Sequence, residues 1–237
     1  MSVPRFHIAT RLVAGEVVTL ATEQAKQLRK VLRQQIGAQV VLFDGSGAEA
    51  MACVISLEAN VATCLVEELC WPQREPACCL TVGLALIRPA NFELAAQKLT
   101  ELGVARIVPL AAERSVVSYP DARDWAGRAA RLQRIAREAA EQSERVTLPE
   151  IVQPQDLRSF LDAQPVIALV ERSAALLLAA REPADAVVLA IGPEGGWSPT
   201  ERAWIEAHAA ATASLGNLIL RAETAAIAAA TLVLHRS

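Results

Sequence analysis

The chain has 237 residues, of which 53% are hydrophobic and 21% charged, and its formal net charge is −3 at pH 7. A chain of this length can bury one large core or two modest ones, and a mildly acidic balance argues against indiscriminate binding to nucleic acid. The apolar run at 225–234 is far shorter than the roughly 20 residues of a membrane helix, and the N-terminus lacks the features of a secretory signal. We therefore expect a cytoplasmic protein without a membrane partner.

The first 72 residues read as short strands around a single helix. Strands are expected at 7–12, 17–20, 39–43, 49–57 and 61–69. The helix is expected at 22–33, because Thr22 is a favourable N-cap residue. Asp44-Gly45-Ser46-Gly47 separates two of the strands and has the composition of a tight hairpin turn. These pieces fit a small β-barrel.

This N-terminal segment is locally basic. Up to residue 33 it carries six basic side chains and two acidic ones, a balance of 6 − 2 = +4: Arg5, Arg11, Lys26, Arg29, Lys30 and Arg33 against Glu16 and Glu23. Two interpretations stay open. The segment is either a basic patch on a mildly acidic protein or a solvated helix face between Thr22 and Arg33.

The five cysteines lie in one stretch of the chain: Cys53, Cys64, Cys70, Cys78 and Cys79. Their number is odd, and they lack both paired C-x-x-C spacing and neighbouring histidines. A chain of this size does not need disulfides for stability. We expect reduced, mostly buried thiols and no metal site.

The segment from Trp71 to Pro76 interrupts any strand or helix. Pro72 and Pro76 each remove a backbone donor and restrict the residue before them. We expect a domain boundary here, with an N-terminal domain at 1–72 and a second domain at 73–237.

Strands and helices alternate beyond this boundary. Apolar strands are expected at 80–86, 105–110, 166–170 and 187–191, and helices from Asn91 to Leu102 and from Trp125 to Ala139. The longer helix has i,i+4 charge pairs on its expected solvent side: Arg134/Glu138, Arg137/Glu141 and Glu141/Arg145. The alternation is typical of an α/β layer with a mostly parallel sheet, which binds ligands at the carboxyl ends of its strands.

The sequence Gly192-Pro193-Glu194-Gly195-Gly196 follows the last of these strands and precedes a well-capped helix start, Ser198-Pro199-Thr200-Glu201. Such a turn exposes backbone groups with little side chain in front of them, which suits a flat, polar ligand such as a nucleoside. It matches neither G-x-x-x-x-G-K-[ST] nor G-x-G-x-x-G, and Glu194 would repel a phosphate. A neutral or cationic nucleoside fits better, and S-adenosylmethionine is one candidate.

A series of motifs occurs in order along the chain: DGSG at 44–47, QKLTELGV at 97–104, ERS at 113–115, EAAEQS at 138–143, PEI at 149–151, IGPEGG at 191–196 and LRAETA at 220–225. Together they resemble the bacterial 16S ribosomal RNA uracil-N3 methyltransferases of the SPOUT superfamily. The resemblance covers nearly the whole chain. It rests on the ordered series, since any one motif is only moderately specific.

The resemblance implies an α/β protein with an N-terminal PUA-like β-barrel for RNA and a SPOUT methyltransferase domain that ends in a trefoil knot. It also implies a homodimer that acts on 16S rRNA in the small ribosomal subunit, with the site completed across the dimer interface. S-adenosylmethionine would lie in the knot. The expected cofactor-binding residues are Leu169, Gly192, Pro193, Glu194, Gly195, Gly196, Leu215, Gly216, Ile219, Leu220 and Arg221.

Methylation at N3 of uracil requires loss of the imide proton and alignment of N3 with the methyl–sulfur bond. We expect Arg221 to stabilise the resulting anion or to orient the base. Glu223 is the nearest carboxylate for removal of the proton, or else a first-turn acid that favours the macrodipole of the last helix. The candidates for RNA contact are Arg5, Arg11, Lys26, Arg29, Arg33 and Arg88.

The chain departs from the common pattern of this family in several places. A histidine is absent around Lys26-Gln27, Pro89-Ala90-Asn91 stands where basic residues are usual, and Thr147, Asn217 and Ala222 replace common Arg, Arg and Thr. These changes concern RNA contacts more than the cofactor loop. Two alternatives therefore stay open: a non-catalytic RNA-binding or ribosome-assembly factor of the same fold, and a methyltransferase acting on another RNA.

Overall fold

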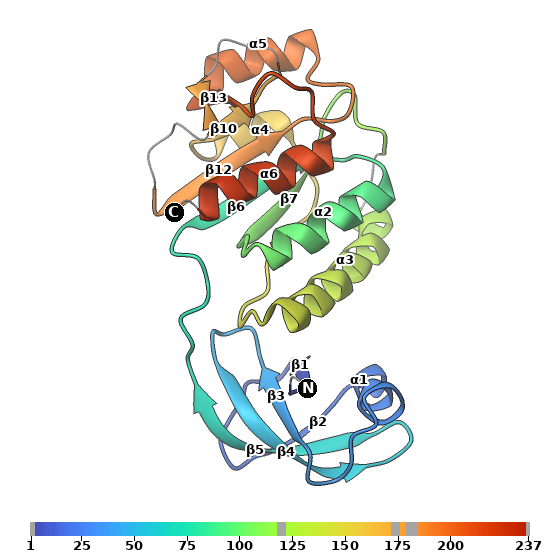
Figure 1. Cartoon of the computed structure of the whole chain (residues 1–237). Helices are drawn as coiled ribbons and strands as arrows, with labels where there is room; N and C mark the ends of the chain where they lie inside the picture. Colours follow the sequence, from blue (N-terminus) through green and yellow to red (C-terminus); the bar gives the residue numbers. More distant parts are fainter. Residues whose placement is uncertain (1–2, 118–121, 172–175, 179–183, 236–237) are drawn as a thin grey trace. The chain divides into compact units, whose positions relative to one another are not determined.

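The computed structural model describes residues 3–117, 122–171, 176–178 and 184–235 (Figure 1). Contacts divide the chain into two compact units. The first unit comprises Met1–Glu75 and Ala140–Leu148, and the second comprises Pro76–Ala139 and Pro149–Ser237. No helix among the described residues combines the length and the apolar character that a membrane span requires.

The first unit is built on a five-stranded sheet with the order β1-β3-β4-β5-β2. Its strands are β1 (Arg5–His7), β2 (Val17–Thr19), β3 (Gln39–Phe43), β4 (Glu49–Leu57) and β5 (Ala62–Cys70). β1 pairs with β3 in parallel, and the other neighbours are antiparallel. The predicted hairpin between β3 and β4 is confirmed, with Asp44 Oδ1 accepting a hydrogen bond of 2.9 Å from the Ser46 N–H in its turn.

The helix predicted at 22–33 differs from its prediction at both ends. α1 (Thr22–Lys26) continues directly into a π-helical segment, η1 (Gln27–Val31). The N-cap is Ala21, and the Gln24 side chain accepts a hydrogen bond of 3.1 Å from the Ala21 N–H, so Thr22 is not the cap. The helix ends before Arg33, whose φ of 52° is left-handed and incompatible with a continuing helix. Ala25 and Leu28 bury the inner face of the helix in the core of the sheet.

Residues 140–148 pack with the first unit although they lie far along the chain. Glu141 Oε1 accepts hydrogen bonds from the His7 N–H (2.9 Å) and from Gln24 Nε2 (3.1 Å). Glu75 accepts from Arg145 Nε (3.0 Å) and from the N–H of Val146 (3.1 Å). Arg145 is only 6% exposed, so the prediction that it faces solvent is wrong.

The second unit holds an eight-stranded sheet whose described pairings are all parallel, which confirms the predicted α/β class. Its main path has the order β11-β13-β10-β12-β6-β7-β8, and β9 pairs with β7. The strands are β6 (Cys79–Ala85), β7 (Arg106–Ala111), β8 (Glu150–Ile151), β9 (Gln155–Asp156), β10 (Ile167–Leu169), β11 (Leu176–Leu177), β12 (Ala186–Ile191) and β13 (Ala211–Ser214).

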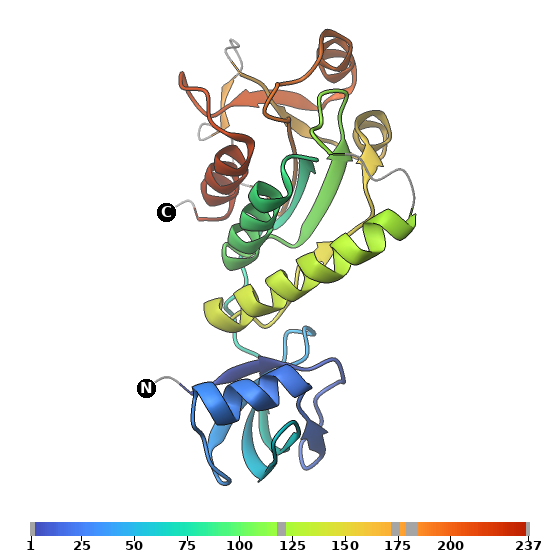
Figure 2. The same ribbon diagram turned by 90° about the vertical axis from the view of Figure 1, so that its right-hand side faces the viewer.

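Helices cover both faces of this sheet (Figures 1 and 2). They are α2 (Pro89–Glu101), α3 (Ala122–Ser143), α4 (Leu157–Asp162), α5 (Pro199–His208) and α6 (Ala222–Leu234). α2 and α6 pack side by side on one core and α4 and α5 on another. Successive side chains of β12 pack on opposite faces of the sheet. Leu189 and Ile191 belong to the core with α2 and α6, whereas Ala190 belongs to the core with α4 and α5. This two-sided burial explains why the strand is apolar throughout.

Helix α2 begins earlier than its prediction. Arg88 is the N-cap and Pro89 is the first helical residue, so Asn91 lies within the first turn. Proline suits this position because the N–H that it lacks would have no partner inside the helix. The predicted end is confirmed, since Gly103 follows the helix with a φ of +95°.

Candidate functional site

The Gly192–Gly196 loop connects the end of β12 to the start of α5. The Gly196 N–H donates a hydrogen bond of 2.8 Å to the Pro193 carbonyl, and Gly196 has a φ of +66°, which favours glycine. The predicted capping box after the loop is confirmed. Ser198 Oγ accepts a hydrogen bond of 3.1 Å from the Glu201 N–H, and Glu201 Oε2 accepts one of 2.8 Å from the Ser198 N–H. The loop is thus held at both ends by regular structure.

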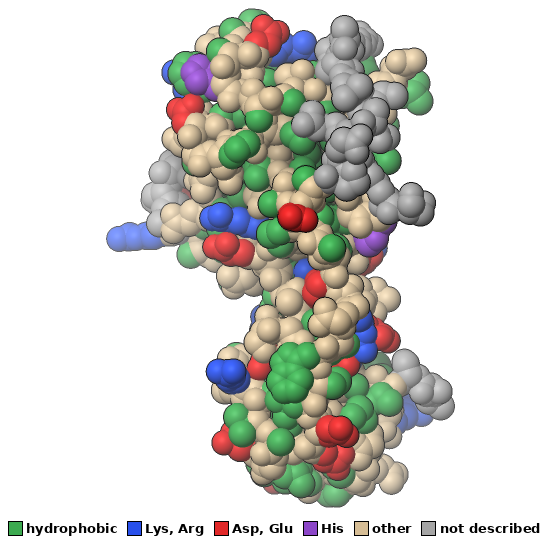
Figure 3. All heavy atoms as spheres, turned by 90° about the vertical axis from the view of Figure 1, so that its left-hand side faces the viewer, with side chains coloured by type: hydrophobic (Ala, Val, Ile, Leu, Met, Phe, Trp, Pro, Cys, Tyr) green, Lys and Arg blue, Asp and Glu red, His purple; other side chains and the backbone are tan. Residues whose placement is uncertain are grey.

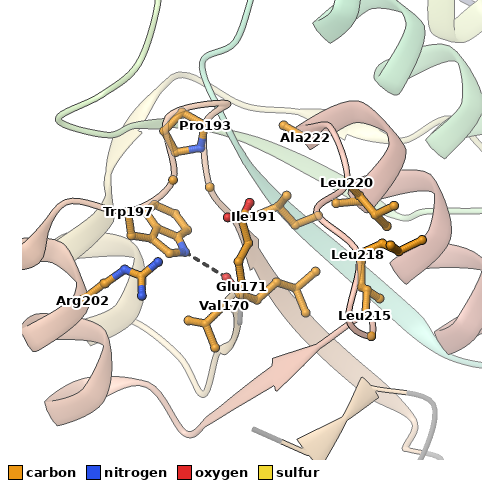
Figure 4. A pocket seen from close by; sticks show the side chains of 15 residues that line it. Val170, Glu171, Ile191, Pro193, Trp197, Arg202, Leu215, Leu218, Leu220 and Ala222 are labelled. Atoms are coloured by element: carbon orange, nitrogen blue, oxygen red, sulfur yellow. Dashed lines mark hydrogen bonds between the residues drawn. The ribbon is translucent and has the colours of Figure 1, made fainter. Parts of the chain in front are cut away.

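A pocket lies where this loop meets the segments that follow β10 and β13 (Figure 4). It contains about 590 Å³ of atom-free space, including space open to solvent. The described lining residues are Leu169, Val170, Glu171, Ile191, Gly192, Pro193, Gly196, Trp197, Arg202, Leu215, Gly216, Leu218, Leu220, Ala222 and Ala225. The pocket therefore stands at the carboxyl edge of the parallel sheet, as predicted for a ligand site.

Trp197 braces two of the three segments that form the pocket. Its Nε1 donates a hydrogen bond of 2.9 Å to the Leu169 carbonyl oxygen, and the residue is only 3% exposed. A Cβ on Gly192 would lie 3.1–3.3 Å from atoms of the indole. The backbone at Gly192 can pass this close to the ring because glycine has no side chain.

The structure brings together many of the predicted cofactor-binding residues but not all of them. The residues that line the pocket are Leu169, Gly192, Pro193, Gly196, Leu215, Gly216 and Leu220. Among the described lining residues the predicted Glu194, Gly195, Ile219 and Arg221 do not occur. Glu194 and Gly195 are exposed, in the turn that the hydrogen bond from the Gly196 N–H to the Pro193 carbonyl closes. Their proposed cofactor contacts are not supported by this placement.

Sequence reasoning missed several lining residues: Val170, Glu171, Ile191, Trp197, Arg202, Leu218, Ala222 and Ala225. Val170, Glu171 and Ile191 were predictable, since they end or follow strands whose neighbouring residues were among the expected cofactor-binding residues. Arg202 was not predictable from the strand ends. It comes from the first turn of α5, and its approach to the pocket depends on how that helix packs on the sheet.

The ERS motif at 113–115 contacts the outer side of the glycine-rich loop. Arg114 Nη1 donates a hydrogen bond of 2.8 Å to the Gly195 carbonyl. Glu201 Oε1 accepts one of 2.8 Å from the Glu113 N–H, and Glu201 is 7% exposed. The segment after β7 is therefore fixed to the start of α5, and its arginine holds the exposed part of the loop.

The two predicted catalytic residues differ in their surroundings. Arg221 is the N-cap of α6 and is exposed. Glu223 is only 6% exposed, and its Oε2 is buried without a hydrogen-bond partner among the described residues. Leaving a carboxylate oxygen buried and unpaired is costly, so a purely structural role explains it poorly. Its place in the first turn of α6 nevertheless agrees with the macrodipole interpretation as well.

Arg5 is withdrawn from the candidates for RNA contact. Its guanidinium forms an ion pair with Glu49, donates a hydrogen bond of 2.7 Å to the Arg145 carbonyl and lies 4.7 Å from the centre of the Phe43 ring. Its side chain is only 8% exposed. Burial raises the pKa of Glu49, but hydrogen bonds from Arg74 and Arg5 outweigh this effect and lower it. Arg5 is thus part of the internal packing of the first unit.

The other RNA candidates are accessible. Arg11, Arg29, Arg33 and Arg88 are exposed, whereas Lys26 pairs with Glu23 at 2.9 Å. Figure 3 shows one face of the chain, on which Lys and Arg side chains lie scattered among Asp and Glu. Contacts of these cations with phosphate stay a prediction.

Comparisons with known proteins agree with this geometry. Residues 74–234 match a family described as an RNA methyltransferase domain, and residues 20–67 match one described as an RNA methyltransferase PUA domain. Ribosomal RNA small subunit methyltransferase E of Synechocystis sp. is 35% identical over 93% of this chain and 74% of that protein. The protein of the same name from Bacillus subtilis is 27% identical over 92% of this chain and 90% of that protein.

Two solved structures cover nearly all of the chain. A ribosomal RNA small subunit methyltransferase E from Neisseria gonorrhoeae, bound to S-adenosyl methionine, is 31% identical with a TM-score of 0.88, and the match covers 97% of this chain and 96% of that one. A putative methyltransferase from Legionella pneumophila, in complex with the bound cofactor SAM, is 28% identical with a TM-score of 0.91 and coverages of 98% and 97%.

Proposed function

The chain belongs to the RNA methyltransferase family that includes ribosomal RNA small subunit methyltransferase E, and we propose that it methylates N3 of a uridine in 16S rRNA. It is an S-adenosylmethionine-dependent enzyme that methylates ribosomal RNA of the small subunit. The observation that carries the proposal is the pocket at the carboxyl edge of the sheet, formed by a glycine-rich loop and two other strand ends. We propose that N3 is the acceptor atom and that the target is a single uridine.

The residues of the pocket fit the cofactor. Leu215, Leu218, Leu220 and the small Ala222 and Ala225 provide an apolar surface on one side, which suits an adenine ring. Gly192 and Gly196 leave backbone groups accessible on the other side. When bound, S-adenosylmethionine supplies a methyl group on a positively charged sulfur. The Gly192–Gly196 loop and the segments that follow β10 and β13 would hold the cofactor. The knot that the family resemblance implies for the end of the chain stays a prediction.

Glu223 is our candidate for the residue that accepts the N3 proton. Uracil N3 becomes nucleophilic only when its proton leaves, so a carboxylate within reach of N3–H promotes the transfer. The buried Oε2 of Glu223 accepts no hydrogen bond from the described residues, so its lone pairs can take up this proton. Arg221 directly precedes the pocket residue Ala222, and its cation is suited to stabilise the uracil anion.

The first unit is our candidate for positioning the RNA. Arg11, Arg29 and Arg33 present exposed cations there, and Arg88 presents one at the start of α2 in the second unit. Contacts of arginine with phosphate hold an RNA without reading its sequence. Recognition of a particular uridine would then depend on the shape of the ribosomal subunit, and the base would have to be unpaired or extruded to react.

We also propose a homodimer that acts in the cytoplasm. Leu218 and Ile219 are 82% and 54% exposed in the segment that borders the pocket. Large apolar side chains beside a ligand site are typical of a surface covered by a partner. A second copy would cover them and complete the site, and sedimentation of the purified protein tests this assembly.

The decisive experiment incubates the protein with methyl-labelled S-adenosylmethionine and either unmodified small ribosomal subunits or naked 16S rRNA. Methylation at N3 blocks base pairing and stops primer extension, so the product is mapped to a nucleotide. We expect one stop, stronger with the subunit than with naked RNA. Cofactor binding without any incorporation would overturn the proposal in favour of another RNA or a non-catalytic role.

A further inference from the structure

The pocket has two charged side chains among its described lining residues, Glu171 and Arg202. The remaining lining residues are glycines, a proline and apolar side chains. Among the described residues, the Glu171 side chain has no hydrogen-bond or ion-pair partner, and Glu171 is exposed. An exposed carboxylate in the lining of a pocket is available to a ligand.

Glu171 stands where a ligand would meet it. It follows the end of β10 by two residues, and Figure 4 shows its side chain directed into the space between Trp197 and Ile191. Trp197 and Ile191 are 3% and 2% exposed and bring no charge of their own. Glu171 itself is exposed, so a bound molecule can reach its carboxylate. Arg202 lies beside Trp197 in the same view.

The cofactor and its product differ in charge at one atom. S-adenosylmethionine has a positive sulfonium, whereas the product of methyl transfer, S-adenosylhomocysteine, has a neutral thioether in its place. The adenosine, the ammonium and the carboxylate are common to both molecules. A residue that distinguishes the two responds either to the methyl group itself or to the charge at sulfur, and a carboxylate responds to the charge.

We propose, building on the proposed function, that Glu171 makes the pocket selective for the positively charged methyl donor over its neutral product. The carboxylate attracts the sulfonium when the donor binds, and this attraction is lost once the methyl group has left. Product release is thereby favoured, while Arg202 offers a cation for the carboxylate that both molecules share.

This role has a kinetic consequence. The positive charge at sulfur decreases in the transition state as the methyl group moves to the uracil anion. An attraction to that charge stabilises the bound donor more than the transition state, so it lowers KM without raising kcat. Glu171→Gln should consequently raise KM for the donor and leave kcat unchanged or slightly higher.

The test measures the dissociation constants of three ligands by calorimetry: S-adenosylmethionine, S-adenosylhomocysteine and sinefungin, which has a protonated amine in place of the sulfonium. Glu171→Gln should lower the affinity for both positively charged ligands by about tenfold and leave the affinity for S-adenosylhomocysteine unchanged. Glu206→Gln is the matched control. It removes the same charge from an exposed residue of α5 that is absent from the described pocket lining, and all three affinities should stay at the wild-type level.

The outcomes separate this proposal from the proposed function. Equal weakening of all three ligands by Glu171→Gln would show that Glu171 contacts a group common to them and would overturn charge selection. Unchanged affinities would overturn it as well. Unchanged binding of S-adenosylhomocysteine also shows that the variant is folded. If the affinities respond to Glu171→Gln as expected but the wild-type protein methylates no ribosomal RNA, the proposed function alone fails.

Discussion

The indole Nε1 of Trp197 donates a hydrogen bond of 2.9 Å to the carbonyl oxygen of Leu169. Both residues line the pocket, and they are only 3% and 8% exposed. Trp197 ends the glycine-rich segment after β12, and Leu169 is the last residue of β10. One buried side chain therefore sets the distance between two of the three chain segments that surround the ligand.

Trp197→Phe should lower the affinity for S-adenosylmethionine by about tenfold and the free energy of unfolding by roughly 1–2 kcal/mol, because it leaves the Leu169 carbonyl without its donor. Calorimetry and urea denaturation measure the two effects. Trp204→Phe in α5 is the matched control, since among the described residues the Trp204 Nε1 has no hydrogen-bond partner to lose. Equal effects of the two substitutions on cofactor affinity would contradict this role of Trp197.

Gly192→Ala tests the close approach between the loop and the indole. The new Cβ would lie 3.1–3.3 Å from Trp197, so either the ring or the loop must move. Overpacking of this kind costs about 1–3 kcal/mol, and we expect a loss of cofactor affinity of about tenfold or more.

Gly195→Ala is the control for this prediction. Its Cβ would meet Arg114 at 3.5 Å, an ordinary contact, and among the described residues Gly195 does not line the pocket. Cofactor affinity should therefore remain near that of the wild type. A Gly192→Ala variant that binds the cofactor as tightly as Gly195→Ala would show that the loop has freedom to shift.

The comparison of these two glycines shows what the sequence can and cannot predict. The loop, its strand and its capped helix were predictable, because Ser198 and Glu201 form a local pattern three residues apart. Which glycines of the loop line the pocket was not predictable. It depends on Trp197 reaching Leu169, 28 residues away along the chain, and on the direction in which Gly196 turns.

The basic N-terminal segment gives the same lesson for charge. Arg5 and Arg29 have equal weight in a count of local charge, but Arg5 is buried against Glu49 and Arg29 is exposed. The partner of Arg5 lies 44 residues away, on β4. Hydrophobic patterns predicted the longer strands of both units, whereas β8, β9, β11 and β13 and the pairings between distant residues required the structure.

Glu223→Gln should lower kcat by about 10²–10⁴-fold if Glu223 accepts the N3 proton, because an amide cannot take this role. The affinity for S-adenosylmethionine should change little, since Glu223 is not among the described residues that line the pocket. Single-turnover methylation and calorimetry give the two quantities. The alternative, a contact with the helix macrodipole alone, predicts normal kcat and a stability loss of only about 0.3–1 kcal/mol. Normal turnover would therefore remove Glu223 from the mechanism.

Glu93 is expected to make the stability of the second unit depend on pH. A hydrogen bond from Arg131 lowers the pKa of Glu93 from 4.5 to about 2; partial burial opposes this shift, and Arg128 adds to it. Because the folded-state pKa is the lower one, the ion pairs stabilise the fold fully above the unfolded value of 4.5. This stabilisation is lost as the pH falls from 4.5 to about 2.

Urea denaturation at pH 7 and at pH 3 measures this effect. Arg131 is 55% exposed, so solvent screens its part of the interaction, and we expect a contribution of roughly 1–2 kcal/mol at pH 7. Glu93→Gln should remove this contribution at pH 7 and change the stability less at pH 3, where the contribution is already partly lost. The control is Glu138→Gln. Glu138 and its partner Arg134 are 60% and 54% exposed, so solvent screens this ion pair and its loss should change the stability little at either pH. A pH dependence that is the same in Glu93→Gln and in the wild type would assign the acid sensitivity to other carboxylates.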